Sequence, residues 1–134
     1  LINKILDIDA PNELLKKLLI PTKIYVKEVM ELLELCEIKG MAHITGGGFE
    51  ENLSRINNDF TMNIDKTKWH MPQVFKEIQS LGNIEEDEMF KVFNCGIGYV
   101  LILSKESAFK AKEINQNLIE IGFVTKELNK CKFI

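Results

Sequence analysis

Apolar residues recur at helical spacing over the first third of the chain. Tyr25, Val29, Leu32 and Cys36 are separated by alternating steps of four and three residues. That spacing places the four side chains along one stripe of an α-helix. We therefore predict a helix that starts at Pro21 and ends near Cys36.

Further helices are expected from apolar spacing together with capping and helix-breaking residues. Ser104 is an N-cap candidate, Pro72 suits a first helical position, and Gly82 follows the end of the helical pattern that begins there. The residues before Asp9–Asn12 also look helical, and that segment breaks the pattern. The other predicted helices cover residues 13–19, 49–56, 72–81, 85–92 and 104–118.

Strand patterns lie between these helices. Residues 38–44 form one strand pattern, and residues 97–103 form a continuous apolar run that is typical of a strand covered on both faces. In residues 60–65 apolar and polar side chains alternate, which predicts a strand with one face in water. Residues 121–125 and 132–134 are candidate closing strands. The interspersed order predicts an α+β fold, an α/β sandwich in which helices pack on the faces of a mixed β-sheet.

Length and charge narrow the possible classes of function. The 134 residues suit one domain, and the net charge of −3, with lysine and arginine scattered, argues against a nucleic-acid partner. The longest apolar run is far too short to span a membrane, and no signal peptide is visible. Three widely spaced cysteines favour a reducing cytoplasm over a disulfide framework. His43 and His70 lack metal-ligand spacing with any cysteine, so we expect no metal site.

Three consecutive glycines separate the strand pattern that ends at Ile44 from the helix pattern that starts at Phe49. Gly46, Gly47 and Gly48 carry no Cβ atoms that would block the approach of a ligand or forbid positive φ angles. Their N–H groups can converge on an anion, and the start of a helix adds partial positive charge. This corner is therefore a candidate phosphate site, and a tight turn without a ligand is the alternative.

Polar side chains flank this glycine corner. His43 and Thr45 have the same parity in the strand, so both point to one side of it. Asn52 and Arg55 are three residues apart and lie near one another on the helix, where Arg55 offers a fork of donors to a phosphate or carboxylate. We predict that these side chains border the anion site.

The residues after the glycines exclude two common phosphate-binding motifs. A P-loop needs Lys-Ser or Lys-Thr after its last glycine, but Phe49 and Glu50 occupy those positions. The dinucleotide-binding fingerprint needs a third glycine or an alanine at the position of Glu51. A different phosphate-binding motif is therefore required.

Four ordered segments cover nearly the whole chain: Leu18–Val26, Ala42–Gly48, Trp69–Phe75 and Gly82–Gly98. Their sequences resemble, in the same order, motifs of the C-terminal half of the aminoimidazole ribonucleotide synthetase family. Four motifs in order make the resemblance more specific than the glycines alone. One departure is Ser54, because the family usually carries a proline before the arginine at this point.

The resemblance implies the fold and activity of an ATP-dependent cyclo-ligase of purine biosynthesis. Enzymes of this family convert formylglycinamidine ribonucleotide and ATP to aminoimidazole ribonucleotide, ADP and phosphate. They hold ATP and Mg²⁺ mainly with an N-terminal domain, through which they also form homodimers. Residues 1–134 would then be the C-terminal domain, with 1–20 as opening helices and 21–134 as the main part. Because Leu1 already lies in a helical pattern, we interpret the chain as a piece of a longer protein, inactive and at most weakly associated by itself.

The family also implies roles for residues on the substrate side of the cleft. The glycine corner would cradle a phosphate, and His43 would hydrogen-bond or transfer a proton near the formyl oxygen. Thr45 and Asn52 would orient polar groups. Two alternatives stay open: a catalytically silent binding or assembly module with the same fold, and a related ATP-dependent enzyme such as formylglycinamidine synthetase. The candidate site residues are His43, Thr45, Gly46, Gly47, Gly48, Asn52, Arg55 and Asn94.

Three other features are each open to a functional and a structural interpretation. The acidic run Glu85–Glu88 is a metal candidate, but the start of a solvated helix explains it better. Cys95 has no histidine near it in sequence, so we interpret it as a small buried residue rather than a nucleophile. Trp69 and Phe75 are expected to pack in the core rather than stack on a base.

Overall fold

A computed structural model describes residues 12–56, 59–127 and 131–134 of the chain. The helix predicted before Asp9 lies outside these residues. The described helices are α2 (Asn12–Leu18), α3 (Val26–Leu35), α4 (Gly48–Ser54), α5 (Gln73–Gly82), α6 (Glu86–Val92) and α7 (Lys105–Ile114), with a short 3₁₀ turn, η1 (Lys66–Lys68). The described strands are β1 (Ile38–His43), β2 (Thr61–Ile64), β3 (Tyr99–Leu103), β4 (Gly122–Thr125) and β5 (Cys131–Phe133).

These strands form two sheets. Strands β1 and β3 make an antiparallel pair in which His43 lies opposite Tyr99. Strand β2 is central in a mixed sheet, antiparallel to β4 and parallel to β5. The predicted α+β class with a mixed sheet is confirmed, and among the described strands β1 and β3 pair separately from that sheet.

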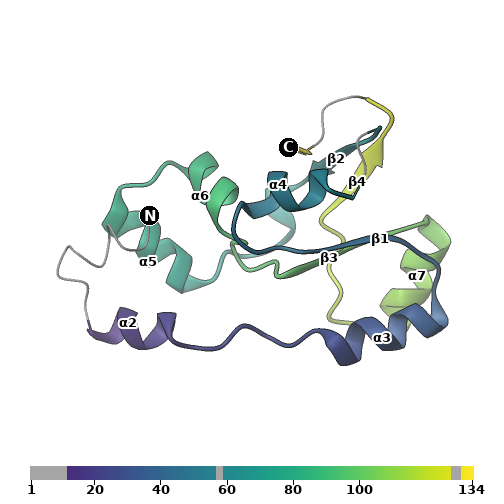
Figure 1. Cartoon of the computed structure of the whole chain (residues 1–134), viewed down its shortest axis with the longest axis horizontal. Coiled ribbons are helices and arrows are strands. Elements are labelled where there is room, and N and C mark those ends of the chain that lie inside the picture. The colour runs from purple at the N-terminus through teal and green to yellow at the C-terminus, as the bar shows by residue number, and fades with distance from the viewer. Residues whose placement is uncertain (1–11, 57–58, 128–130) are drawn as a thin grey trace.

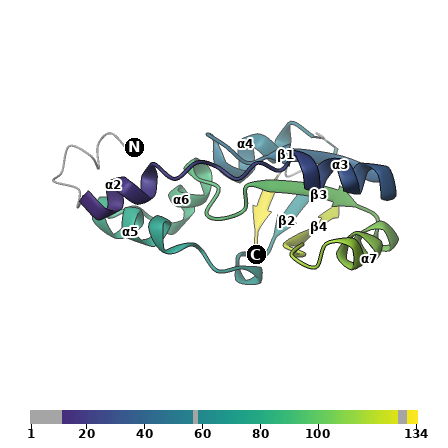
Figure 2. The same cartoon turned by 90° about the horizontal axis from the view of Figure 1, so that it is seen from below.

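The molecule is elongated along the β1–β3 pair (Figure 1). Helix α2 contacts α5 at one end, and α3 contacts α7 at the other. Residues 21–25 have neither helical nor strand structure, and they join α2 to α3 along the molecule (Figure 2). Helix α4 follows β1 directly and contacts both α6 and β5.

The main hydrophobic core lies around α4. Phe49 is fully buried in this helix, and its ring contacts the rings of Trp69, Phe90 and Phe133 at centroid distances of 5.7 to 6.0 Å. Phe90 and Phe133 also contact each other at 5.1 Å. A second, smaller cluster between α3 and α7 contains Leu32, Cys36 and Ala111. The interlocked rings around Phe49 fix the position of α4, and with it one wall of the site described below.

Three predicted helix ends that differ from the structure are those of α3, α5 and α7. Helix α3 begins at Val26 rather than Pro21, because β-branched residues favour extended backbone over the preceding segment. Helix α5 includes Gly82, and Asn83, with φ of 44°, ends it in the left-handed conformation. Ser104 caps α7 as predicted and accepts a hydrogen bond from the Ser107 N–H, but the helix ends at Ile114.

The predicted water-facing side of β2 is also wrong, since all four of its residues are buried. The Asn63 amide donates to the Thr125 hydroxyl at 3.1 Å and to the Phe123 carbonyl at 3.4 Å. The Thr61 hydroxyl donates to the carbonyl of Glu127. Alternating polar residues in β2 therefore bond to the neighbouring strand and the segment after it rather than to water.

Within the described residues, no helix combines the length and the apolar character that crossing a membrane would require.

Candidate functional site

The glycine corner joins β1 to α4 in a conformation that depends on glycine. Gly47 and Gly48 have φ angles of 88° and 55°, which residues with side chains rarely adopt. A Cβ atom on Gly48 would collide with the Phe90 carbonyl oxygen and lie 2.7 Å from the Lys91 carbonyl carbon. A Cβ on Gly46 would meet no atom within 4 Å. Gly48 thus serves the packing of α4 on α6, while Gly46 faces open space.

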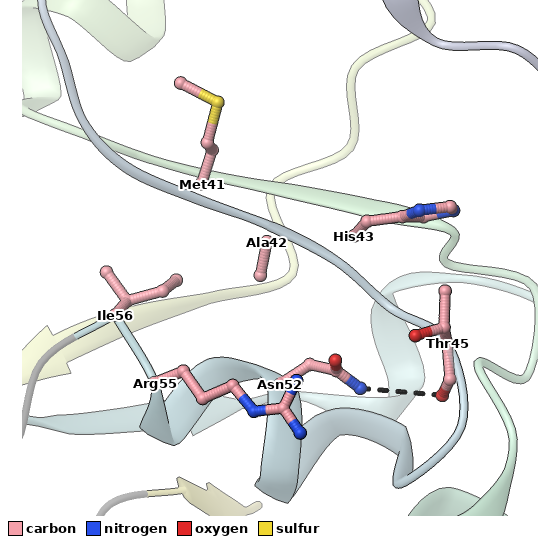
Figure 3. Close-up of a pocket in the computed structure, with 7 residues that line it drawn as sticks. All are labelled: Met41, Ala42, His43, Thr45, Asn52, Arg55 and Ile56. Atoms are coloured by element: carbon pink, nitrogen blue, oxygen red, sulfur yellow. Dashed lines mark hydrogen bonds between the residues drawn. The ribbon is translucent and has the colours of Figure 1, made fainter.

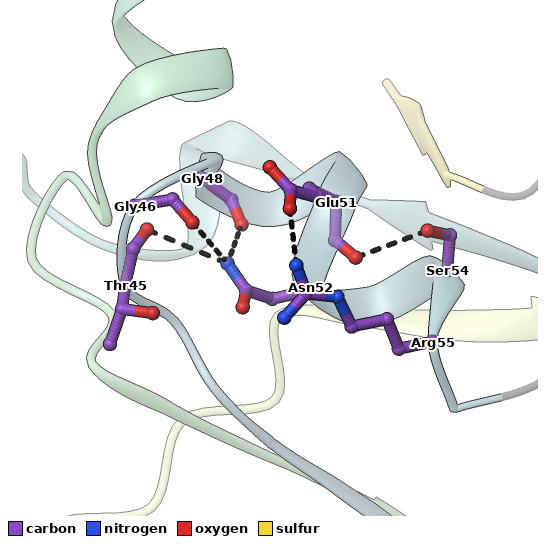
Figure 4. Close-up of polar contacts among 7 residues, drawn as sticks. All are labelled: Thr45, Gly46, Gly48, Glu51, Asn52, Ser54 and Arg55. Carbon is purple, nitrogen blue, oxygen red and sulfur yellow. Dashed lines mark hydrogen bonds and ion pairs between the residues drawn. The ribbon is translucent and has the colours of Figure 1, made fainter.

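Asn52 holds the carbonyl groups of this corner. Its side-chain Nδ2 donates to the oxygens of Gly48 at 2.7 Å, Gly46 at 3.3 Å and Thr45 at 3.5 Å (Figure 4). These three acceptors fix the orientation of the amide and turn its oxygen away from them. Within the described part of the chain, neither Asn52 Oδ1 nor the N–H groups of Gly46 and Gly47 has a hydrogen-bond partner.

An open hollow of about 360 Å³ lies beside the corner, between β1 and the end of α4 (Figure 3). The polar side chains that line it come from β1, from α4 and its end, and from the turn that joins these two elements. Four of the eight predicted site residues meet there. The residues that line it are Met41, Ala42, His43, Thr45, Asn52, Arg55 and Ile56.

His43 is exposed at the end of β1 and is held by ring contacts. Its imidazole stacks on Tyr99 at 5.9 Å between centroids and 27° between planes, and meets Tyr25 edge-on at 6.1 Å. The two tyrosines lie 5.5 Å apart. Among the described residues, the imidazole has no hydrogen-bond partner. We call Tyr25, His43 and Tyr99 the rim cluster.

Arg55 lies on the same hollow but is engaged by an acid. Its guanidinium pairs with Glu51 one helical turn earlier, and both side chains are more than half exposed. The Glu51 carboxylate also lies so close to Gly47 that a Cβ there would collide with it. A carboxylate at this place repels an incoming anion, and an exposed pair of this kind is weak. Arg55 can therefore exchange Glu51 for a ligand at little cost.

Asn94 does not join the other candidates. Its side-chain oxygen accepts a hydrogen bond from the Gly96 N–H at 3.0 Å, in a local turn. Asn94 is absent from the residues that line the hollow. The glycines of the corner do not line the hollow either, but they border it through Asn52 and Thr45.

The structural interpretations of three other features are confirmed. Trp69 packs against Phe49, and its Nε1 donates to the Cys95 carbonyl at 3.0 Å. Burial raises the pKa of the Cys95 thiol to about 12, with a smaller contribution from Glu86, so this sulfur stays protonated and unreactive. In the first turn of α6, Glu86 pairs with Lys66 at 3.3 Å.

No metal centre is formed by the residues described here: nowhere among 12–56, 59–127 and 131–134 do three or more His, Cys, Asp or Glu side chains gather so that they could hold an ion.

Tyr25 and Tyr99 were not predicted as site residues. Tyr25 was assigned to the apolar stripe of a helix, and Tyr99 to a buried strand. Tyr99 could have been found from strand pairing alone, since it lies directly opposite His43. Nothing in the local pattern indicates that Tyr25 reaches the same place.

Comparison with known protein families matches residues 2–130 to the family described as "AIR synthase related protein, C-terminal domain". Three similar proteins are each named phosphoribosylformylglycinamidine cyclo-ligase. That of Geotalea daltonii is 48% identical over 116 residues, which are 86% of this chain and 33% of that protein. That of Methanococcus vannielii is 47% identical over 112 residues, 84% of this chain and 32% of the relative. That of Clostridium botulinum strain Langeland is 50% identical over 112 residues, which are 83% of this chain and 33% of that protein. The chain thus spans about a third of the length of these relatives.

Proposed function

Because this chain belongs to the AIR synthase related family, as its C-terminal domain, we propose that it supplies the substrate side of a phosphoribosylformylglycinamidine cyclo-ligase. The reaction closes the ring of formylglycinamidine ribonucleotide and converts ATP to ADP and phosphate. The relatives' shared name favours this activity over formylglycinamidine synthetase. The single observation that carries the proposal is the meeting of His43, Thr45, Asn52 and Arg55 on one hollow.

Unpaired polar atoms make this hollow suitable for a polar ligand. The imidazole of His43, the hydroxyl of Thr45 and Oδ1 of Asn52 have no hydrogen-bond partner within the described residues. Binding sites typically combine a concave surface with a few convergent polar groups. In our proposal Asn52 Oδ1 accepts a hydrogen bond from the amidine nitrogen of the substrate, and Thr45 orients a neighbouring polar group.

The substrate phosphate fits the glycine corner. The N–H groups of Gly46 and Gly47, which have no hydrogen-bond partner among the described residues, are donors of the kind that cradle phosphates. Helix α4 has only seven residues, so the backbone donors of the turn contribute more than its dipole. Arg55 would leave Glu51 and bind the phosphate as a second donor. Gly48 contributes by packing rather than by contact with the ligand.

His43 is the group proposed to act on the reacting atoms. An imidazole can donate a hydrogen bond to the formyl oxygen or move a proton as that oxygen leaves. ATP, bound with Mg²⁺, would turn the formyl oxygen into a phosphate leaving group. As the family resemblance implies, we assign ATP and Mg²⁺ mainly to an N-terminal half of the full-length enzyme.

An apolar strip marks the surface proposed to face that N-terminal half. Ile24 is 81% exposed and Val26 is 66% exposed, in the segment that also carries Tyr25. Leu19 and Ile20 are exposed just before it. Large exposed apolar patches are typical of surfaces that another protein part covers. Since Tyr25 in this segment contacts His43, a half that covers the strip would lie beside one of the residues that line the hollow.

The remaining expectations follow from the same assignment. We propose that the enzyme forms a homodimer through its N-terminal half and acts in the cytoplasm, where the three free cysteines would stay reduced.

Substitution of His43 in a full-length enzyme tests the proposal. We expect His43→Ala to lower kcat by about 100-fold, the usual contribution of a general acid or base. Stability should fall by no more than about 1 kcal/mol, because His43 is exposed and, within the described part of the chain, has ring contacts but no hydrogen bond. Steady-state release of ADP and formation of aminoimidazole ribonucleotide measure the effect.

The matched control is His70→Ala, which removes the other, exposed histidine. Equal turnover of the two variants would remove His43 from the site. Binding of the ribonucleotide without any turnover in the wild-type enzyme would instead support the silent binding module.

A further inference from the structure

Among the residues that the structure describes, the rim cluster holds the proposed acid–base group through aromatic contacts alone. Each of the three rings touches the other two, at centroid distances of 5.5, 5.9 and 6.1 Å. These distances fall in the range where aromatic pairs attract one another in tilted and edge-on arrangements. Because His43 has no hydrogen-bond partner within the described residues, ring contacts alone set the direction of its imidazole.

Strand pairing brings the first tyrosine to His43. His43 is the last residue of β1 and Tyr99 is the first residue of β3, and the two lie directly opposite in the antiparallel ladder. Side chains of opposite residues point to the same face of a sheet, with Cβ atoms about 5 Å apart. The stacked arrangement of the two rings, with 27° between their planes, follows from that register.

Close backbone approach brings the second tyrosine. A Cβ atom on Gly98 would collide with the Tyr25 hydroxyl and lie 2.8 Å from its Cζ, so only glycine leaves room for this ring. The Gly98 carbonyl also accepts a hydrogen bond from the Ile44 N–H at 2.8 Å. Gly98 therefore ties together the segment that carries Tyr25 and the end of the strand that carries His43.

Tyr25 is further fixed from its own side of the contact. The ammonium of Lys23 lies 5.3 Å from the centre of its ring and pairs with Glu28 at 2.8 Å. Tyr25 is also the N-cap residue of helix α3, and its carbonyl accepts the first hydrogen bond of that helix, from the Val29 N–H. The ring is thus held by three different parts of the chain.

We propose that Tyr25 and Tyr99 are positioning residues that aim the His43 imidazole into the hollow. This inference rests on the proposed role of His43 in the cyclo-ligase reaction. The tyrosines act through the histidine and need not touch the substrate. Their removal releases the imidazole to other rotamers, in which it no longer reaches the formyl oxygen.

A double-mutant cycle in the full-length enzyme tests this inference. We expect Tyr25→Ala to lower kcat by about 5-fold, the size of one aromatic contact, and to leave the KM for the ribonucleotide unchanged. Tyr25→Phe should restore kcat, because the ring does the positioning. In a His43→Ala enzyme, Tyr25→Ala should have no additional effect, since nothing is left to position.

Two results would overturn the inference. One is a loss of kcat from Tyr25→Ala that is equally large with and without His43, and the other is an effect on KM alone. If Tyr25→Ala fails to unfold cooperatively on heating, Tyr99→Leu takes its place in the same cycle with the same expectations. A normal kcat for His43→Ala would refute the proposed role of His43, on which this inference rests, whereas a lowered kcat with independent effects refutes only the positioning role of the tyrosines.

Discussion

Two aromatic clusters include residues of the strand–glycine–helix unit, Phe49 in its helix and His43 in its strand, and they differ in burial and in chemistry. The inner cluster surrounds Phe49, which is completely buried, and contains only rings that do not titrate near neutral pH. The rim cluster includes the exposed His43 and two half-buried tyrosines. In our proposal, similar ring contacts thus stabilise the core in the inner cluster and direct the His43 imidazole in the rim cluster.

The difference between the inner cluster and the rim cluster has a physical cause. Phe49 and Asn52 lie on α4, so the inner cluster also sets where Asn52 meets the glycine corner. A fully buried phenyl ring contributes several kilocalories per mole, but it cannot exchange protons. A ring at the surface contributes less and stays accessible to a ligand. Loss of each cluster should therefore produce a different phenotype.

The largest stability effect is expected in the inner cluster. Phe49→Ala should lower the free energy of unfolding by about 3–5 kcal/mol, through lost burial and a cavity. Phe109→Ala is the matched control, because Phe109 is 70% exposed on α7, and its effect should stay within about 0.5 kcal/mol. Urea unfolding of both variants measures the difference, and similar values would contradict the assignment of the core.

A smaller loss is expected where α4 meets α6. Gly48→Ala should cost about 2–4 kcal/mol, because the new methyl group collides with the Phe90 carbonyl and the φ of 55° is strained for alanine. Gly46→Ala adds the same methyl group in open space and should change stability by less than about 0.5 kcal/mol. Equal destabilisation by the two variants would show that the corner has a different conformation.

Truncation of a ring in the rim cluster should lower the free energy of unfolding less than Phe49→Ala or Gly48→Ala. Tyr99→Ala removes a half-buried ring at a strand end, and we expect a loss of about 1 kcal/mol. Thermal or urea unfolding of Tyr99→Ala, measured in parallel with Phe49→Ala, provides the comparison of the two losses. A loss as large as that of Phe49→Ala would mean that the rim cluster is part of the core.

The smallest effect concerns the acid beside the corner. Glu51→Gln removes the carboxylate that pairs with Arg55 and lies against Gly47, so the ribonucleotide should bind about 2–5-fold more tightly. Glu50→Gln removes the same charge from the same helix without an Arg55 contact, and its affinity should match wild type. Calorimetric titration of the full-length enzyme measures both; weaker binding by Glu51→Gln would show that the acid helps to bind substrate.

The local sequence pattern was sufficient to predict the strand–glycine–helix unit. Three glycines between a strand pattern and a helix pattern indicated a corner, and strand parity indicated that His43 and Thr45 share a side. Both line the hollow in the structure. These features depend on neighbours in sequence, so propensity and periodicity can predict them.

Long-range packing explains what the pattern missed. Asn52 was predicted to orient substrate groups, yet its amide nitrogen is used by three carbonyls of the corner, which come into reach only through the left-handed φ angles of Gly47 and Gly48. By its spacing, Tyr25 fits the apolar stripe of a helix. In the structure its ring contacts His43, because Gly98 has no side chain to block the approach. Neither contact can be inferred from residues close in sequence.

A crystal structure of the full-length enzyme with its ribonucleotide substrate tests the proposed site most directly. We expect the substrate phosphate within hydrogen-bond distance of the Gly46 and Gly47 N–H groups, and the formyl oxygen within reach of the His43 imidazole. A substrate bound elsewhere, with the hollow between β1 and α4 still empty, would contradict the assignment.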